Sequence, residues 1–507
     1  MREVDIERTA YPQLNQNITD REIIQRYTLS PEELSLVQEY RGNSLSLAVR
    51  LKVFGHLLSH NLSLSEIPPR VIDYLASQLQ VSSETCSFTR DQRLRQIELI
   101  RQHTGFSPFT STEHENLSRW LILQAEKQFH LVDLVNEAIF HLIEAKVELP
   151  SFQRLLRMAA HALQQSDISQ KELLNQSLNF ELKGKLDALL QSECQYQRTP
   201  FYELKEPPET PSASAIIKEI QLLQRLRSLG KFDTATPADN LSFDALKQIN
   251  NDRIKHFFEI AKSYKSNELY DLVPETRYPI LLCFIYMRLK EVTDNIVELL
   301  IRLWAKSAKD ALRAQDEYVL KRDEAKQQGE ELYEQLLEII VESNSKDEIV
   351  DRIFGLHSYD EYKSLLSTLR QLKKPKKVKY FEALSSKYSF LRRFTPLIWE
   401  NLTFRSNTSD DTLIQAIEYL KENLQPSIPE LPVKGAPIDF VPDDWDRHVF
   451  VRQRGSRKIL SINKSMYELC IIERLIDKII SSEIYVSGSQ YYSSLEEYLI
   501  SKEEFLS

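Results

Sequence analysis

Glycine is scarce in this sequence, and its scarcity restricts the folds that the chain can adopt. The chain has 10 glycines among 507 residues, about 2% where soluble proteins usually have about 7%. Glycine supplies the positive φ angles of tight hairpin turns and the close backbone approach of phosphate-binding loops. Leu, Glu, Gln, Lys and Ile are abundant instead, and most of these lose little entropy in a helix. We therefore expect a mainly α-helical chain.

Length and composition indicate an ordinary soluble, multi-domain protein. A chain of 507 residues suggests about three or four domains. The four cysteines are far apart and form no CxxC pair, which suits a reducing cytoplasm and argues against a disulfide framework or zinc ribbon. The N-terminus has no apolar signal-peptide core, and the longest strongly apolar run, 279–287, is far shorter than the ~20 residues that span a bilayer. We expect a cytoplasmic protein with no membrane partner.

Proline-rich segments divide the sequence into regions. Residues 1–190 have the pattern of short amphipathic helices, and the polar segment 191–214 contains four prolines and is predicted to be a linker. Residues 215–424 form a region of longer helices, with two or three expected in 276–343. In 425–507 a proline-rich connector precedes a small mixed α/β segment.

Two features refine these regional predictions. In the first region, Ser30 is placed to cap a helix that begins at Pro31. In the last region, strands are expected at 448–453 and 458–462 and a helix at 463–482.

Positive charge is concentrated in one stretch of an acidic protein. The formal net charge is -9, yet residues 365–406 hold ten Lys or Arg against two Glu, with Tyr and Phe interleaved. Such a stretch is typical of a nucleic-acid contact. A solvated helix face beside a charged loop fits the same composition. The candidate DNA-contacting residues in this stretch are Lys373, Lys374, Lys376, Lys377, Arg392 and Arg393.

The segment 131–166 has the pattern of two helices joined by a short turn. Apolar residues of the second helix recur at helical spacing, and its opposite face presents Gln153, Arg154 and Arg157. Arg and Gln in the first turns of such a helix are the side chains that form paired hydrogen bonds with guanine and adenine. We therefore predict a helix-turn-helix-like DNA reader here. An ordinary helical hairpin with a polar face remains the alternative.

Four arginines crowd the segment "TRDQRLRQIELIRQHTGFSPF" (89–109). If this segment is helical, Arg90, Arg93 and Arg101 fall within an arc of roughly 80°. Three guanidinium groups on one side could hold DNA phosphates. Ion pairing with nearby Asp91 and Glu98 would explain the same residues without DNA.

Signals of catalysis are absent from the sequence. It contains no HExxH, no Cys/His set with zinc spacing and no GxxxxGK[ST], GxGxxG or GxSxG motif. The carboxylates are too numerous for spacing to single out a catalytic pair. The sequence therefore nominates no catalytic residue and no metal ligand.

The C-terminal segment resembles a characteristic stretch of Tn-three family transposases, the enzymes of replicative bacterial transposons. In that family a helix containing Tyr-Glu precedes a strand, a turn and a final "yL…eeW" motif. The similar segments here are "YELC" (467–470), "LIDKIISSEIYVSGSQYY" (475–492) and "YLISKEEF" (498–505). This chain departs from the family pattern at Ser482-Glu483, at Gln490-Tyr491 and at Phe505. Further similar segments follow in the same order along the chain, at 27–54, 89–109, 146–159, 277–287, 391–404 and 437–450.

The resemblance implies a DNA-binding function. It implies that the N-terminal helical modules bind the transposon's terminal inverted repeats, and that 215–424, with its basic stretch at 370–393, supports dimerisation and scaffolding. The partners implied are double-stranded DNA and a second copy or a full-length transposase, in the bacterial cytoplasm at the nucleoid. In the family, an RNase H-like domain with an Asp-Asp-Glu triad and two divalent metals lies downstream of 465–505. We therefore expect neither catalytic carboxylates nor a cofactor in this chain.

A second interpretation needs no DNA. The family departures and the acidic character of residues 1–200, which hold 21 basic and 25 acidic side chains, also fit a degenerate helical remnant or a protein-interaction scaffold.

Overall fold

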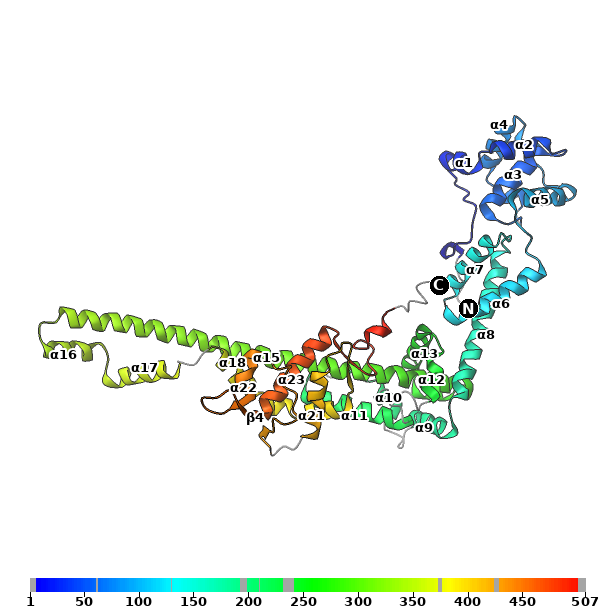
Figure 1. Cartoon of the computed structure of the whole chain (residues 1–507). Coiled ribbons are helices and arrows are strands. Elements are labelled where there is room, and N and C mark those ends of the chain that lie inside the picture. The colour runs from blue at the N-terminus through cyan, green and yellow to red at the C-terminus, as the bar shows by residue number, and fades with distance from the viewer. Residues whose placement is uncertain are drawn as a thin grey trace. The chain divides into compact units, whose positions relative to one another are not determined.

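The computed structural model describes residues 6–60, 63–128, 130–191, 198–208, 210–230, 241–372, 376–423 and 428–499 (Figure 1). Among these, the side chains of residues 90, 91, 230, 241, 242, 376 and 377 are not described. The fold is mainly α-helical with two small antiparallel sheets, which confirms the predicted class. The chain forms two compact units. The first comprises residues 1–177, 245–257 and 274–279, and the second comprises 178–244, 258–273 and 280–507.

Eight helices belong wholly to the first unit. They are α1 (Asp20–Tyr27), α2 (Pro31–Glu39), α3 (Ser44–Leu57), α4 (Pro69–Leu79), α5 (Arg90–Thr104), α6 (Ser111–Lys127), α7 (Leu131–Glu144) and α8 (Phe152–Gln176). α2 begins as predicted, because the Ser30 hydroxyl accepts from the Glu33 N–H while the Glu33 carboxylate accepts from the Ser30 N–H. Three further helices contain residues of both units: α12 (Leu241–Lys247), α13 (Asn251–Ser263) and α15 (Pro274–Glu342).

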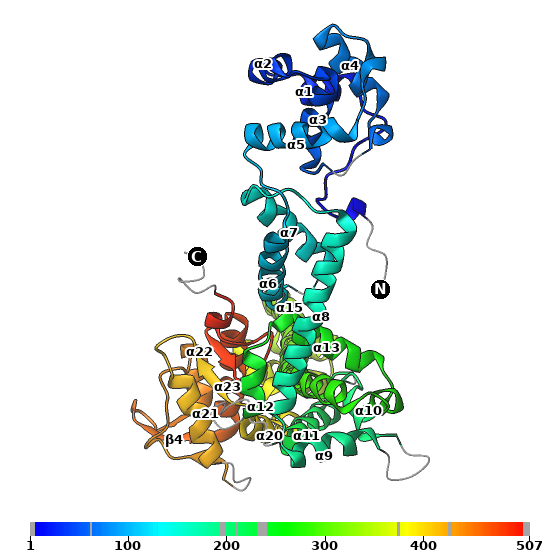
Figure 2. The ribbon, with the colours of Figure 1, turned by 90° about the vertical axis from the view of Figure 1, so that its right-hand side faces the viewer.

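The first unit has two apolar cores. One lies among α1 to α5, with α3 almost fully buried at its centre, and includes Tyr27, Phe54 and Leu75. The other lies among α6, α7 and α8, which pack against one another (Figure 2). Backbone hydrogen bonds join the segment after α5 to the segment before α8: the Ser107 N–H donates to the Lys146 carbonyl, and the Glu148 N–H donates to the Ser107 carbonyl.

Residues 274–342 form one helix, α15, where the sequence suggested two or three. The polar stretch 308–330 contains no proline, and the proline inside the helix, Pro279, lies near its start. A proline at that position removes the hydrogen bond to the carbonyl four residues earlier. That carbonyl, of Glu275, instead accepts a hydrogen bond of 2.7 Å from the Asn175 amide. The helix therefore continues because a side chain of α8 replaces the missing donor.

The remaining elements belong to the second unit. The helices are α9 (Phe180–Leu190), α10 (Pro200–Leu204), α11 (Ala213–Gly230), α14 (Ser266–Tyr270), α16 (Lys346–Leu356), α17 (Tyr359–Gln371), α18 (Lys376–Ser386), α19 (Tyr388–Leu391), α20 (Thr395–Asn401), α21 (Thr412–Glu422), α22 (Asp443–Val449) and α23 (Lys464–Ile480). The strands are β1 (Phe404–Ser406), β2 (Glu430–Leu431), β3 (Phe450–Arg452), β4 (Ile459–Asn463) and β5 (Ile484–Val486).

The strand and helix order near the C-terminus matches the sequence prediction. β3 and β4 are antiparallel neighbours, β2 completes their sheet, and α23 follows β4 directly. Within the segment predicted to be a linker, α10 buries Phe201 and Leu204. The end of α10 is held in place by Arg288 of α15, whose guanidinium donates to the backbone carbonyl oxygens of Leu204 and Glu206.

Glu468 of α23 is a fully buried carboxylate that organises the centre of the second unit. Its oxygens accept from the Tyr388 hydroxyl at 2.9 Å, the Thr395 hydroxyl at 2.7 Å and two contacts of the Arg392 guanidinium at 2.9 and 3.1 Å. The Trp399 indole N–H donates more weakly, at 3.4 Å. Buried charge is tolerated where it is paired and hydrogen-bonded. One carboxylate thus holds α19, α20 and the residues between them against α23.

Asp294 of α15 makes a comparable anchor for the turn after β5. Its carboxylate accepts from the Ser489 hydroxyl and from the backbone N–H groups of Gln490 and Tyr491. Burial raises the pKa of Asp294 above its ordinary value, and these three donors oppose that effect. The turn therefore depends on a side chain 195 residues earlier in the chain.

Candidate nucleic-acid interface

The arginines of α5 have different surroundings. Arg93 is exposed and makes a long contact of 3.4 Å with the His60 carbonyl. Arg101 forms two hydrogen bonds with the carboxylate of Glu148, at 2.6 and 3.0 Å. The side chain of Arg90 lies outside the described residues. Of the candidates Arg93 and Arg101, only Arg93 is open to a ligand, because Arg101 is held by its carboxylate.

Positive charge gathers around His60. Burial, and then the charges of Arg101, Arg50 and Arg93, lower the pKa of His60 to about 4. The imidazole is therefore neutral at physiological pH, although Glu148 lies 3.5 Å away. With His60 neutral, the three guanidinium groups have two nearby carboxylates, Glu148 and Glu98, both of which act on Arg101, so this part of the first unit carries excess positive charge.

Arg50 was missed by the sequence reasoning. It is only 7% exposed, and its guanidinium lies 3.6 Å from the centroid of the Phe88 ring. A signal was present, since Arg50 lies within the apolar run "LSLAVRL" (45–51). A charged side chain among core positions needs a partner or a function.

The polar face of α8 is open, as the sequence predicted. Gln153 and Arg157 are exposed, and the Arg157 Nε–H donates to the Gln153 carbonyl at 3.1 Å. Arg154 lies over the ring of Phe109, 4.9 Å from its centroid. Among the described residues, neither arginine forms an ion pair. Both guanidinium groups therefore remain available to an anionic partner.

The connection that precedes α8 is longer than that of a helix-turn-helix motif. Residues 145–151 join α7 to α8, whereas the motif has a turn of about three to four residues. Lys146 has a φ of 53°, and Val147 forms a parallel bridge with Ser107. The structure thus shows a helical hairpin with a basic face, and recognition of DNA by α8 stays a prediction.

Much of the basic stretch is neutralised by distant carboxylates. Lys387 lies 2.9 Å from Asp310, and Arg392 is paired with Glu468. Counting charges in a sequence window missed these partners, because they come from α15 and α23. Arg393 is exposed, and no ion pair involving it appears among the described residues. Lys373 and Lys374 lie outside the described residues, as do the side chains of Lys376 and Lys377.

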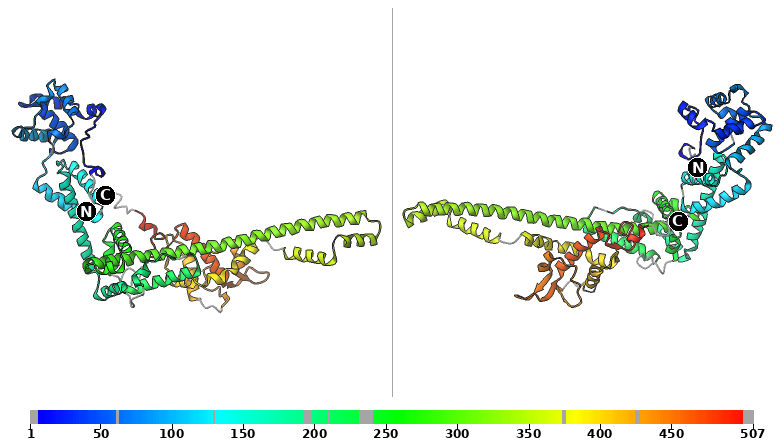
Figure 3. Two further views of the ribbon diagram at one scale, coloured as in Figure 1. Left: turned by 180° about the vertical axis from the view of Figure 1, so that it is seen from behind. Right: turned by 45° about the horizontal axis from the view of Figure 1, so that its top comes forward.

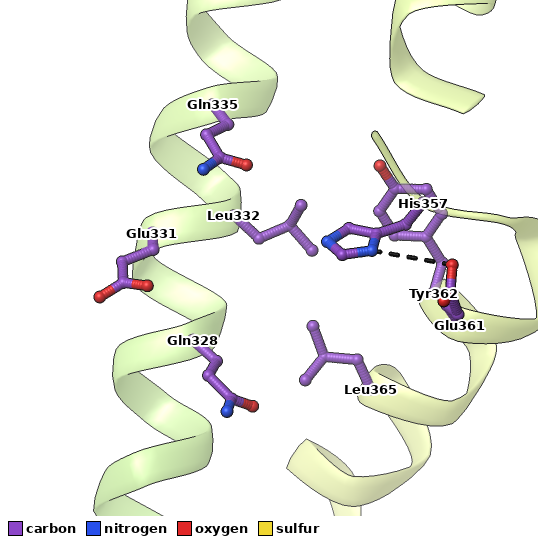
Figure 4. Close-up of a pocket in the computed structure, with 8 residues that line it drawn as sticks. All are labelled: Gln328, Glu331, Leu332, Gln335, His357, Glu361, Tyr362 and Leu365. Carbon is purple, nitrogen blue, oxygen red and sulfur yellow. Dashed lines mark ion pairs between the residues drawn. The ribbon is translucent and has the colours of Figure 1, made fainter. Parts of the chain in front are cut away.

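The second unit also contains a polar groove along α15. α16 and α17 run back alongside the distal part of this helix (Figures 1 and 3), and the groove between them has a volume of about 380 Å³ (Figure 4). It is lined by Gln328, Glu331, Leu332, Gln335, His357, Glu361, Tyr362 and Leu365. His357 lies 3.7 Å from Glu361. Leu332 and Leu365 face each other across the groove, so the contact between α15 and α17 here is narrow.

Two negative findings apply to the described residues. They include no group of three or more His, Cys, Asp or Glu side chains placed to hold one metal ion. None of their helices combines the length and apolar character needed to cross a lipid bilayer.

Comparison with known proteins finds similarity to bacterial transposases. Residues 4–162 match a family model described as a domain of unknown function, DUF4158. The chain is 25% identical over 494 residues to the transposase for transposon Tn1546 of Enterococcus faecium, and 23% identical over 493 residues to that for Tn21 of Escherichia coli. These matches cover 94% and 96% of the chain. The chain is thus similar to transposases of the Tn-three family along nearly its whole length.

The similarity covers nearly all of this chain but only about half of each relative. The transposase for Tn501 of Pseudomonas aeruginosa is likewise 23% identical, over 96% of the chain. In all three comparisons the chain spans 48% of the relative's length. The family-like segments "YELC" and "SGSQYY" are the ones that contain Glu468 and the turn bound by Asp294. Both segments thus have an evident structural reason for their residues.

Proposed function

We propose that this chain recognises the terminal inverted repeats of a transposon and helps to assemble the complex that carries out transposition. The observation that carries the proposal is the similarity to transposases along 94–96% of the chain. The charge distribution of the first unit supports it. Arg93, Arg154 and Arg157 project from helices without carboxylate partners among the described residues, in a protein whose net charge is -9.

The candidate residues would make different kinds of contact with DNA. Arg93 would neutralise a backbone phosphate, since phosphate contacts fix register without reading sequence. Gln153, Arg154 and Arg157 occupy the first two turns of α8, where side chains that read base edges are placed in helical readers. Arg101 would act indirectly, because its pair with Glu148 fixes α5 relative to the residues before α8. In the second unit, Arg393 is the described candidate for a further phosphate contact.

The proposal is tested by DNA binding across a salt series. The purified chain is titrated, by fluorescence anisotropy, against its own element's inverted repeat and against a scrambled duplex of equal length. We expect tighter binding to the repeat and a linear fall of log K with log[salt], with a slope of about -0.9 for each phosphate neutralised. Equal affinity for both duplexes, or no binding of either at low salt, would instead favour the scaffold or remnant interpretation.

Removal of single guanidinium groups should weaken binding to the repeat. We expect Arg93→Ala, Arg154→Ala and Arg157→Ala each to cost about tenfold in affinity, since a hydrogen bond to a charged group is worth about 1.5 kcal/mol. The salt slope should become less steep for each variant that loses a phosphate contact. Arg95→Ala is the matched control: Arg95 is also exposed on α5, but lies about 160° around the helix from Arg93. Equal losses for Arg93→Ala and Arg95→Ala would show that net charge alone matters.

We also propose that the distal part of α15, with α16 and α17, associates with a second copy of the chain. Large apolar side chains are exposed there, and Val341 is 81% exposed. The others include Tyr333, Leu337, Ile340, Val350, Phe354 and Tyr359. The same part of α15 carries both signs of charge, with pairs such as Lys326 and Glu330. Exposed apolar surface rimmed by mixed charges is typical of a helix–helix interface.

Introduction of charge into this surface should dissociate the assembly. We expect the double variant Tyr333→Glu/Val341→Glu to be monomeric at concentrations where the unaltered chain is dimeric, since a buried unpaired carboxylate is strongly unfavourable. Light scattering after size-exclusion chromatography, over a hundredfold range of concentration, measures the mass. Ile480→Glu is the control, because Ile480 is also exposed, on α23. A monomeric unaltered chain, or a double variant that remains dimeric, contradicts the proposal.

A further inference from the structure

The position of Arg50 is unusual for an arginine. It lies in the middle of α3, whose neighbouring residues Val49 and Leu51 belong to the core of the first unit. Its side chain is 7% exposed, and its guanidinium rests on the Phe88 ring at 3.6 Å. An arginine stem can pack among apolar groups, but its charged head normally reaches water or a carboxylate.

Among the described side chains, no carboxylate forms an ion pair with Arg50. Its Nε is buried without a hydrogen-bond partner, and no hydrogen bond or ion pair of the described residues involves its guanidinium. The carboxylate of Glu148 is engaged by another arginine, because both of its oxygens accept hydrogen bonds from Arg101. A charge buried without a partner costs free energy. The fold therefore holds Arg50 in place at a cost that a partner anion would relieve.

Arg93 adds a second positive charge to the same place. Burial, and then the charge of Arg93, lower the pKa of Arg50, so the two guanidinium groups are close enough to repel each other. Both also act on His60, whose carbonyl is contacted by Arg93. One of the pair is buried and held by α3, while the other is exposed on α5. The pair thus combines a buried guanidinium held by α3 with an accessible one on α5.

We propose that Arg50 and Arg93 together bind one phosphate group of the DNA backbone. This inference rests on the proposed function, and it adds to it a residue that neither the sequence pattern nor the comparisons assign. Guanidinium groups form paired N–H···O bonds with phosphate, and such bonds are stronger in a partly buried site. A phosphodiester carries one negative charge, which would separate the two positive charges and give the Arg50 guanidinium an acceptor.

The inference is tested on the full chain with Arg50→Met, which keeps an apolar stem against Phe88 and removes the charge. Melting temperature is measured in sodium chloride and in inorganic phosphate of equal ionic strength. We expect phosphate to raise the melting temperature of the unaltered chain, and this increment to disappear in Arg50→Met. In chloride, the variant should melt at the same temperature as the unaltered chain or higher. Arg93→Met, at an exposed position, should lose the same increment, and Arg95→Met should keep it.

DNA binding provides the second arm of the test. Arg50→Met should reduce affinity for both the inverted repeat and the scrambled duplex by about the same factor, roughly fivefold, and flatten the salt slope by about 0.9, as expected for one phosphate contact. Unchanged DNA binding by Arg50→Met, with intact binding by the unaltered chain, overturns the phosphate site alone. If the unaltered chain binds no DNA but is stabilised by phosphate through Arg50, the anion site stands and the DNA proposal fails. A lower melting temperature in chloride, with no loss of the phosphate increment, would make Arg50 purely structural.

Discussion

Glu468→Ala is expected to destabilise the second unit by about 3–5 kcal/mol, the usual cost of removing one partner of a buried ion pair. The carboxylate is fully buried, and the variant would leave Arg392 without its counter-charge. Tyr388 and Thr395 would lose their acceptors at the same time. Burial, followed by the negative charge of Glu468, raises the pKa of Tyr388, so this phenol stays protonated as a donor. Two neutral donors would then lose their acceptor, and Arg392 would lose its paired carboxylate.

The effect can be measured by urea unfolding followed by tryptophan fluorescence. Three of the four tryptophans, Trp304, Trp399 and Trp445, belong to the second unit, so the signal reports mainly on that unit. Glu418→Ala is the matched control, because Glu418 is an exposed glutamate on α21 whose pair with Lys421 is a surface ion pair. Such a pair is worth less than about 1 kcal/mol.

A double-mutant cycle separates the ion pair from the other donors. Arg392→Met alone should cost less than Glu468→Ala, because it removes a single donor group and leaves the carboxylate with its hydroxyl partners. The two changes together should cost less than the sum of the single changes, since each single change already removes the Arg392–Glu468 pair. A loss below about 1 kcal/mol for Glu468→Ala would show that water or rearrangement satisfies these groups.

The sequence predicted the fold class because the physical cause is local. Scarce glycine and abundant helix formers bias each segment independently, and caps such as Ser30 act within one turn. The strands near 450 and 460 and the helix α23 were predicted for the same reason. The length of α15 was underestimated because the polar stretch 308–330 suggested a solvated segment, whereas polar residues without a proline do not by themselves end a helix.

The candidate site was only partly predictable. Helical spacing placed Gln153 and Arg157 on an exposed face, where the structure also has them. It could not show that Arg101 forms an ion pair with Glu148 or that Arg392 forms one with Glu468. Tertiary packing brings each carboxylate to its arginine from a distant part of the sequence. Arg50 was hidden for the opposite reason. Its helix is almost fully buried and shows no amphipathic pattern, so the signal for Arg50 was its place within the apolar run 45–51 and not helical spacing.

Asp294→Ala is expected to cost about 2–4 kcal/mol, since each buried donor left without an acceptor costs about 1–3 kcal/mol. The variant would strand the Ser489 hydroxyl and the N–H groups of Gln490 and Tyr491, although the Ser489 oxygen keeps its bond from the Tyr492 N–H. Glu298→Ala is the control: Glu298 lies four residues further along α15, and its pair with Arg302 is exposed. Urea unfolding of both variants gives the comparison.

Asp294→Asn should be much milder, at about 1 kcal/mol or less, because an amide oxygen at the Oδ1 position can accept the same bonds. Burial raises the pKa of Asp294, so its contribution to stability is fully present below the ordinary aspartate pKa and is lost as the pH rises through the raised one. Asn does not titrate, and the difference in stability between the asparagine variant and the unaltered chain should therefore favour the variant more as the pH rises through that window. Equal losses for the alanine and asparagine variants would mean that the negative charge, rather than the accepting oxygen, holds the turn to α15.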